Sequence, residues 1–72
     1  MLQIDARHLP CPMPLLKAKK GLNSLSSGEQ IKVMATDAGS WRDFAVFTEL
    51  SGHTMISATD DDGEYIYIIE KK

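Results

Sequence analysis

The only cysteine of the chain stands between prolines, in the segment Cys11-Pro12-Met13-Pro14. Proline is tolerated in the first turn of a helix, and the apolar residues after Pro14 recur at helical spacing, so Cys11 is predicted at the start of a helix. Unpaired N–H groups and the positive end of the helix dipole favour an anion there. We therefore predict a reactive thiol with a lowered pKa, held outward by the stiff Pro12 and Pro14.

Several neighbours of the motif are candidates to tune this thiolate. Arg7, His8 and Lys17 could add positive charge, and Met13 could border the thiol as a soft apolar contact for partners. One thiol cannot run an intramolecular dithiol–disulfide cycle. A Cys–His hydrolase needs a histidine positioned as base, and His8 and His53 qualify by residue type alone. One thiolate is sufficient to accept sulfur from a donor persulfide and pass it on.

The competing interpretation of Cys11 is a buried structural residue, because free cysteines often serve as small apolar side chains. The position between prolines at a helix start favours the reactive thiol, since a core cysteine needs no such frame. One cysteine and two histidines cannot form a multi-thiolate zinc site. We expect no metal and no cofactor.

Two groups of residues are candidates for partner docking. Lys19 and Lys20 follow the motif on the predicted first helix, and Trp41 and Arg42 begin the second. The competing interpretation of the lysines is the solvated face of an amphipathic helix. Core packing is the competing interpretation of Trp41, although its place in the first helical turn predicts an exposed ring.

Composition and charge limit the classes of function. The 72 residues are 43% hydrophobic and 25% charged with a net charge of −2, as in one globular domain. Residues 1–28 carry +3 and residues 29–72 carry −5, which is unlike the strongly basic profile of nucleic-acid binders. No apolar run approaches the roughly 18 residues of a membrane span, and no signal peptide pattern is visible. We expect a single domain over 1–72 that is cytoplasmic and monomeric, without membrane or stable nucleic-acid binding.

Hydrophobic periodicity predicts strands over 2–6, 30–36, 53–59 and 64–70 and helices over 13–25 and 40–51. Because strand–helix–strand crossovers are right-handed, both helices should lie on one face of a four-stranded mixed sheet. The predicted fold is thus a two-layer α/β sandwich of the α/β (α+β) class. Ser40 and Asp43 are predicted to form a capping box, Gly21 to allow close packing, and residues 60–63 to form the hairpin turn.

The whole chain resembles the TusA/SirA-like family of sulfur-carrier proteins. The resemblance is carried by Cys-Pro-x-Pro at 11–14, the strand before it, and the matching positions Leu15-Leu16-Lys17, Gly28-Glu29, Asp37, Asp43, Gly52-His53 and 65–69. The family commonly has Gly-Leu ahead of the motif, where this chain has His8-Leu9.

The resemblance implies a two-layer sandwich in which Cys11 carries persulfide sulfur and Pro12 and Pro14 frame it. It implies a sulfur donor, such as a cysteine desulfurase or rhodanese-like protein, and a downstream acceptor. Such a sulfurtransferase could serve tRNA thiolation, molybdenum-cofactor formation or another sulfur pathway. A non-catalytic interaction or redox-regulatory module is the alternative, and a small RNA-binding domain is a third interpretation.

Overall fold

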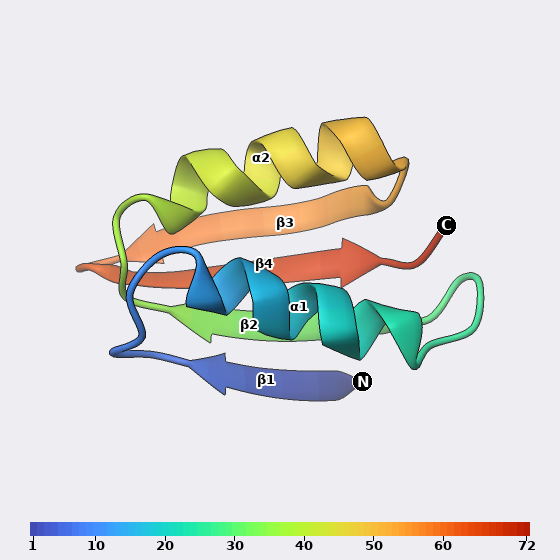
Figure 1. Ribbon diagram of the computed structural model, residues 1–72, viewed down its shortest axis with the longest axis horizontal. Helices are drawn as coiled ribbons and strands as arrows, with labels where there is room; N and C mark the ends of the chain where they lie inside the picture. Colours follow the sequence, from blue (N-terminus) through green and yellow to red (C-terminus); the bar gives the residue numbers. More distant parts are fainter.

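The computed structural model describes residues 1–72 and places two helices on one face of a four-stranded sheet (Figure 1). In chain order the elements are β1 (Leu2–Ala6), α1 (Met13–Asn23), β2 (Gln30–Ala35), α2 (Ser40–Ser51), β3 (Thr54–Asp61) and β4 (Glu64–Glu70). The predicted α/β sandwich and its β-α-β-α-β-β order are confirmed.

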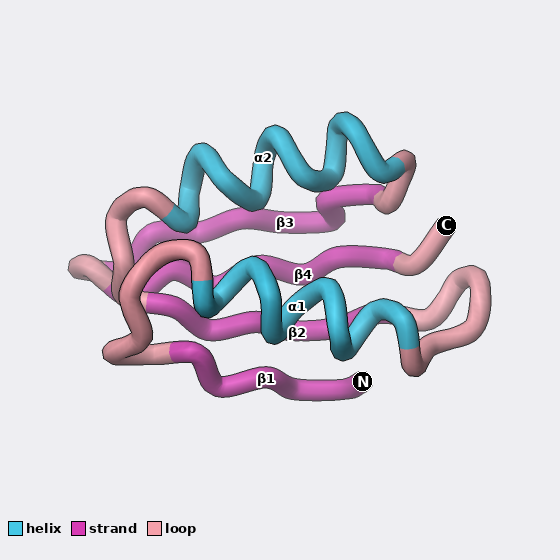
Figure 2. The backbone as a smooth tube through the Cα atoms, viewed as in Figure 1, coloured by secondary structure: helices cyan, strands magenta, loops and turns pink.

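The strands lie in the order β1-β2-β4-β3, side by side in Figure 2. β1 and β2 are parallel, whereas β4 is antiparallel to both β2 and β3. Both helices begin at the same end of the sheet, where the loops after β1 and β2 also lie (Figure 1). The topology therefore brings Cys11 close to the residues that precede α2.

The core lies between the helices and the sheet. Along β2 the side chains alternate, with Ile31, Val33 and Ala35 fully buried and Lys32 and Met34 only half-buried. This period of two is the signature of a strand with one covered face. The nine buried apolar residues form one cluster: Ala6, Ala18, Leu22, Ile31, Val33, Ala35, Phe44, Tyr67 and Ile69.

Gly21 lets α1 approach β1 closely, as the sequence predicts. A Cβ atom at this position would collide with the Cδ1 atom of Ile4. A glycine inside a helix costs about 1 kcal/mol relative to alanine, and alanine at position 21 would require the Ile4 side chain to shift.

The predicted capping box at the start of α2 is wrong. Gly39 is the N-cap residue and no side chain caps the helix. The Ser40 hydroxyl instead lies 2.7 Å from the phenol oxygen of Tyr67, in a buried hydrogen bond. Because Ser40 turns inward, Asp43 in the same turn is free to bond elsewhere.

Boundaries of three predicted elements also move. α1 ends at Asn23 rather than at residue 25, because the Ser24 hydroxyl and backbone N–H both bond to the Gly21 carbonyl. β2 stops at Ala35, one residue short of its predicted end. β3 runs from Thr54 to Asp61, into the predicted turn, since the reversal needs only Asp62 and Gly63 at φ 53° and 86°. Positive φ at both central residues is typical of the tightest hairpin turns.

Candidate functional site

Cys11 lies in the turn immediately before α1, and its side chain is exposed. Pro12 is the N-cap residue of the helix and Met13 is its first residue, as the sequence predicts. Pro14 is fully buried in the first turn, and the Leu16 N–H donates to the Pro12 carbonyl at 3.1 Å. The two prolines therefore connect the thiol to the helix and to the core beneath it.

The thiol is hydrogen-bonded to a carboxylate of the second helix. The Sγ atom of Cys11 donates to Oδ2 of Asp43 across 2.7 Å, although the two residues are 32 positions apart in the sequence. Asp43 stands in the first turn of α2 and is half-buried. This contact forms because both helices begin at the same end of the sheet.

The predicted lowering of the thiol pKa is wrong for this arrangement. The pKa of Cys11 is raised, first by the hydrogen bond to Asp43, then by partial desolvation and by the negative charges of Asp43 and Asp37. A helix N-terminus supplies only about half a positive charge. A full carboxylate charge in direct contact with the sulfur outweighs it.

Arg7, His8 and Lys17 do not tune the thiol as predicted, because the structure places them elsewhere. Arg7 pairs with Asp5 at 3.0 Å, and its guanidinium lies 3.7 Å from Glu64. The backbone N–H of His8 donates to the Thr36 hydroxyl at 2.8 Å. The three predicted residues line a separate shallow hollow together with Asp5 and Leu9. None of them contributes to the pKa of Cys11.

A second acidic side chain, Asp37, lies near Gly39, as does Cys11. One carboxylate oxygen of Asp37, Oδ2, is buried without a hydrogen-bond partner. A Cβ at position 39 would lie 3.0 Å from that oxygen and 4.0 Å from Cβ of Cys11. The absence of a side chain at Gly39 therefore leaves room for the Asp37 carboxylate. A larger residue at position 39 would crowd that carboxylate.

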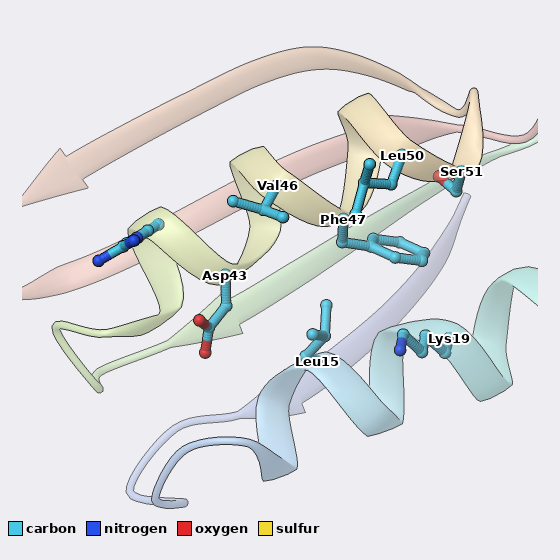
Figure 3. A pocket seen from close by; sticks show the side chains of 8 residues that line it. Leu15, Lys19, Asp43, Val46, Phe47, Leu50 and Ser51 are labelled. Atoms are coloured by element: carbon cyan, nitrogen blue, oxygen red, sulfur yellow. The ribbon is translucent and has the colours of Figure 1, made fainter.

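A groove lies between the two helices. Figure 3 shows Leu15 and Lys19 of α1 and Asp43 and Phe47 of α2 projecting into it. Its volume is about 610 Å³, and its lining is completed by Arg42, Val46, Leu50 and Ser51. Cys11 does not line the groove, but Asp43 both lines it and accepts the hydrogen bond of the thiol, so Asp43 links the groove to Cys11.

The predicted docking residues divide between this groove and other surfaces. Lys19 and Arg42 line the groove, and the Lys19 ammonium lies 5.5 Å from the centre of the Phe47 ring. Lys20 lines a different hollow beside β1. Trp41 is 45% exposed, as predicted for its place in the first turn, and its ring centre lies 5.9 Å from that of Tyr65. Met13, at 40% exposure, is accessible next to the thiol.

Asp43 is the site residue to which sequence reasoning assigns no chemical role. Its sequence position, three residues after Ser40, indicates a helix cap, and nothing local links it to Cys11. The signal exists only in the topology: two helices that start at one end of a sheet bring their first turns together. No group of three His, Cys, Asp or Glu side chains is arranged to hold a metal ion, and neither helix is long and apolar enough to cross a membrane.

Comparison with known proteins gives a consistent result. The model of the family described as Sulfurtransferase TusA matches residues 2–71. The chain is 41% identical to the sulfur carrier protein TusA of Allochromatium vinosum over 96% of this chain and 91% of that protein. It is 36% identical to the sulfur carrier protein TusA of Pseudomonas entomophila, over 96% and 86% of the two chains.

The fold has a solved counterpart. A SirA-like protein from Desulfitobacterium hafniense superposes with a TM-score of 0.85 at 28% identity, over 97% of this chain and 96% of the other. The match of the family model to residues 2–71 and the identity to curated relatives over almost the whole chain agree with this likeness. The chain belongs to the TusA family.

Proposed function

We propose that this protein is a sulfur-relay carrier in which Cys11 holds the transferred sulfur as a persulfide. The observation that carries the proposal is the placement of the only cysteine of a TusA-family chain: its thiol is exposed in the turn immediately before α1. A single accessible sulfur is sufficient for a carrier, because both half-reactions use the same atom.

In the loading step the Cys11 thiolate attacks the outer sulfur of a donor persulfide. A new S–S bond forms at Cys11 while the S–S bond of the donor breaks, and the donor cysteine leaves as a thiolate that takes up a proton. In the delivery step an acceptor nucleophile attacks the outer sulfur, and Cys11 is the leaving thiolate. Neither step needs an oxidant, because this is thiol–disulfide exchange with one sulfur atom as the transferred group.

The groove between α1 and α2 is the proposed docking surface for these partners. Its lining includes Asp43, the hydrogen-bond partner of Cys11, half of its lining side chains are apolar, and one of these, Leu50, is 82% exposed. Lys19 and Arg42 line it without an ion-pair partner within 4 Å. Lys19 and Arg42 favour an apolar partner segment with acidic flanks, whereas Asp43, which also has no ion pair, favours a basic side chain at its own position in the groove. Trp41 and Lys20 extend the contact beyond the groove.

The donor is proposed to be a cysteine desulfurase or a rhodanese-like protein, and the acceptor a second protein of a thiolation, molybdenum-cofactor or other sulfur pathway. We propose that the carrier acts as a cytoplasmic monomer. Two different proteins must reach the same sulfur in turn, and a monomer with an exposed thiol allows this.

A two-step relay tests the proposal. The protein is loaded by a cysteine desulfurase with cysteine, separated from the enzyme, and offered cyanide, which takes persulfide sulfur as thiocyanate. We expect close to one thiocyanate per chain from the wild type and none from Cys11→Ala. Equal thiocyanate from both proteins would exclude Cys11 as the carrier atom.

A further inference from the structure

The pair formed by Cys11 and Asp43 poses a problem for a carrier. Acceptance of sulfur needs a thiolate, since the thiol itself is a poor nucleophile. In this structure the thiol donates its proton toward Asp43 Oδ2 across 2.7 Å, and the negative charge of Asp37 further raises the pKa of the thiol. Thus the side-chain partner of the sulfur is a carboxylate and not a cation.

We propose that Asp43 keeps Cys11 in its thiol form in the free carrier, and that a transfer partner releases it by placing a basic side chain against the Asp43 carboxylate. The first half concerns this chain alone. The second half rests on the proposed function, since it requires a sulfur-transfer partner.

The surroundings of Asp43 leave it available to such a partner. Arg42 and Lys19 line the same groove, but neither forms an ion pair with Asp43 within 4 Å. The Asp43 side chain is half-buried, and the open groove exposes it from outside the chain. A cation from a docked protein can therefore reach the carboxylate without displacing a cation of this chain.

Pairing of Asp43 with a cation changes the proton balance at the sulfur. The neutralised carboxylate no longer repels a negative sulfur, so the Cys11 proton passes to solvent and the thiolate forms at the positive end of α1. That thiolate attacks the outer sulfur of the donor, and the departing donor cysteine takes up a proton. The sum is one thiol and one persulfide exchanging a sulfur atom, with no net change in protons or electrons.

The same restraint acts on the loaded carrier. On delivery Cys11 must leave as a thiolate, and a thiol of lower pKa leaves faster. While Asp43 is unpaired it disfavours that leaving group, so the persulfide is retained between partners. The Asp43 carboxylate thereby restricts both the uptake and the loss of sulfur to the complex with a partner protein.

The alkylation rate of Cys11 by iodoacetamide, measured against pH, tests the first half. In Asp43→Asn we expect the midpoint to fall by about one pH unit. Such a fall gives about tenfold more thiolate at pH 7, but each thiolate is less nucleophilic because its pKa is lower. The alkylation rate at pH 7 should therefore rise roughly threefold. Asp43→Glu keeps a carboxylate and should restore a high midpoint. Glu49→Gln removes the same charge from an exposed position of α2 and should change nothing.

Equal midpoints in the wild type and Asp43→Asn would overturn this half. If Asp43→Asn does not fold, the wild type decides. An alkylation midpoint of wild-type Cys11 above that of glutathione supports the proposal that Asp43 keeps Cys11 in its thiol form. A midpoint below that of glutathione contradicts it.

The second half is tested by comparing two sulfur donors, glutathione persulfide and a cysteine desulfurase. Asp43→Asn should load about threefold faster from the small donor, because its thiolate is already free, and no faster from the enzyme. An equal gain with both donors would overturn the partner's role. If the wild type takes sulfur from neither, the proposed function fails, whereas the alkylation profile still reports on Asp43.

Discussion

The hydroxyl of Ser40 and the phenol of Tyr67 lie 2.7 Å apart in the buried layer between α2 and β4. This bond fixes the first turn of α2 on the sheet, and Asp43 projects from the same turn toward Cys11. The Tyr67 ring is also stacked on Phe44, with ring centres 4.3 Å apart. The position of the thiol's hydrogen-bond partner therefore depends on a polar contact inside the core.

Replacement of Ser40 by alanine should destabilise the fold. The Tyr67 hydroxyl would lose its partner while fully buried, and an unsatisfied buried polar group costs about 1–3 kcal/mol. The free energy of unfolding, measured by urea titration, is expected to fall by that amount.

The double variant Ser40→Ala with Tyr67→Phe is the control for this prediction. Removal of both partners leaves no orphaned group, so the double variant should be more stable than the sum of the two single losses predicts. Strict additivity would mean that the two hydroxyls do not interact.

Gly52 ends α2 in the left-handed conformation, at φ 86°, and its N–H donates to the Thr48 carbonyl at 3.2 Å. A side chain strains this conformation by about 1–2 kcal/mol, so Gly52→Ala should lower the unfolding free energy by that amount. Asparagine tolerates the left-handed region better, and Gly52→Asn should lose less. Equal losses in thermal or urea unfolding would point to a clash with Lys72 instead.

The Asp5 carboxylate should titrate at unusually low pH. Its hydrogen bonds with Arg7 lower its pKa from 3.8 to about 2. Because the folded pKa lies below the unfolded one, the stabilisation is present above about pH 4 and is lost as the pH falls through about 2. A carbon NMR titration should give a midpoint near 2 in the wild type and near the ordinary value in Arg7→Gln. A normal midpoint in the wild type would refute the pairing in solution.

Charge reversal in the groove should slow sulfur transfer from proteins. Arg42→Glu and Lys19→Glu each place a negative charge where the proposed partner segment is acidic, and steering by complementary charge changes association rates tenfold or more. We expect loading from a cysteine desulfurase at low salt to slow by about tenfold relative to loading from glutathione persulfide.

The matched control for this reversal is Lys32→Glu. Lys32 belongs to β2, and its side chain stands outside the groove. The same change in net charge there should leave the ratio of the two loading rates unaltered. An equal slowing in Lys32→Glu would assign the effect to overall charge and remove the support for the groove.

The fold follows from local signals in the sequence. Alternation in 30–36 and 64–70 and helical spacing after Pro14 predict the elements within a few residues, and the Asp-Gly pair predicts the hairpin. The predictions fail where a polar side chain has more than one possible hydrogen-bond partner. Ser40 bonds across the core rather than to its own helix, because the buried Tyr67 hydroxyl needs a partner.

The site is less accessible to such reasoning. The position of Cys11 at a helix start is a local property, and the sequence predicts it. The protonation of the Cys11 thiol depends on Asp43, 32 residues away in the sequence. It also depends on which acidic side chains the nearby basic residues pair with. Sequence proximity suggests Arg7 as the tuning group, but Arg7 is held by Asp5 and lies near Glu64 instead.

Intact-mass analysis after incubation with a cysteine desulfurase and cysteine shows whether Cys11 takes up a sulfur atom. The wild type should gain about 32 Da, one sulfur atom, and lose it again on treatment with a reductant. Cys11→Ala should gain nothing while keeping the same circular dichroism spectrum, since the exposed thiol is not part of the core. A wild type that alkylates at Cys11 but takes up no sulfur from desulfurases or rhodaneses would contradict the carrier function.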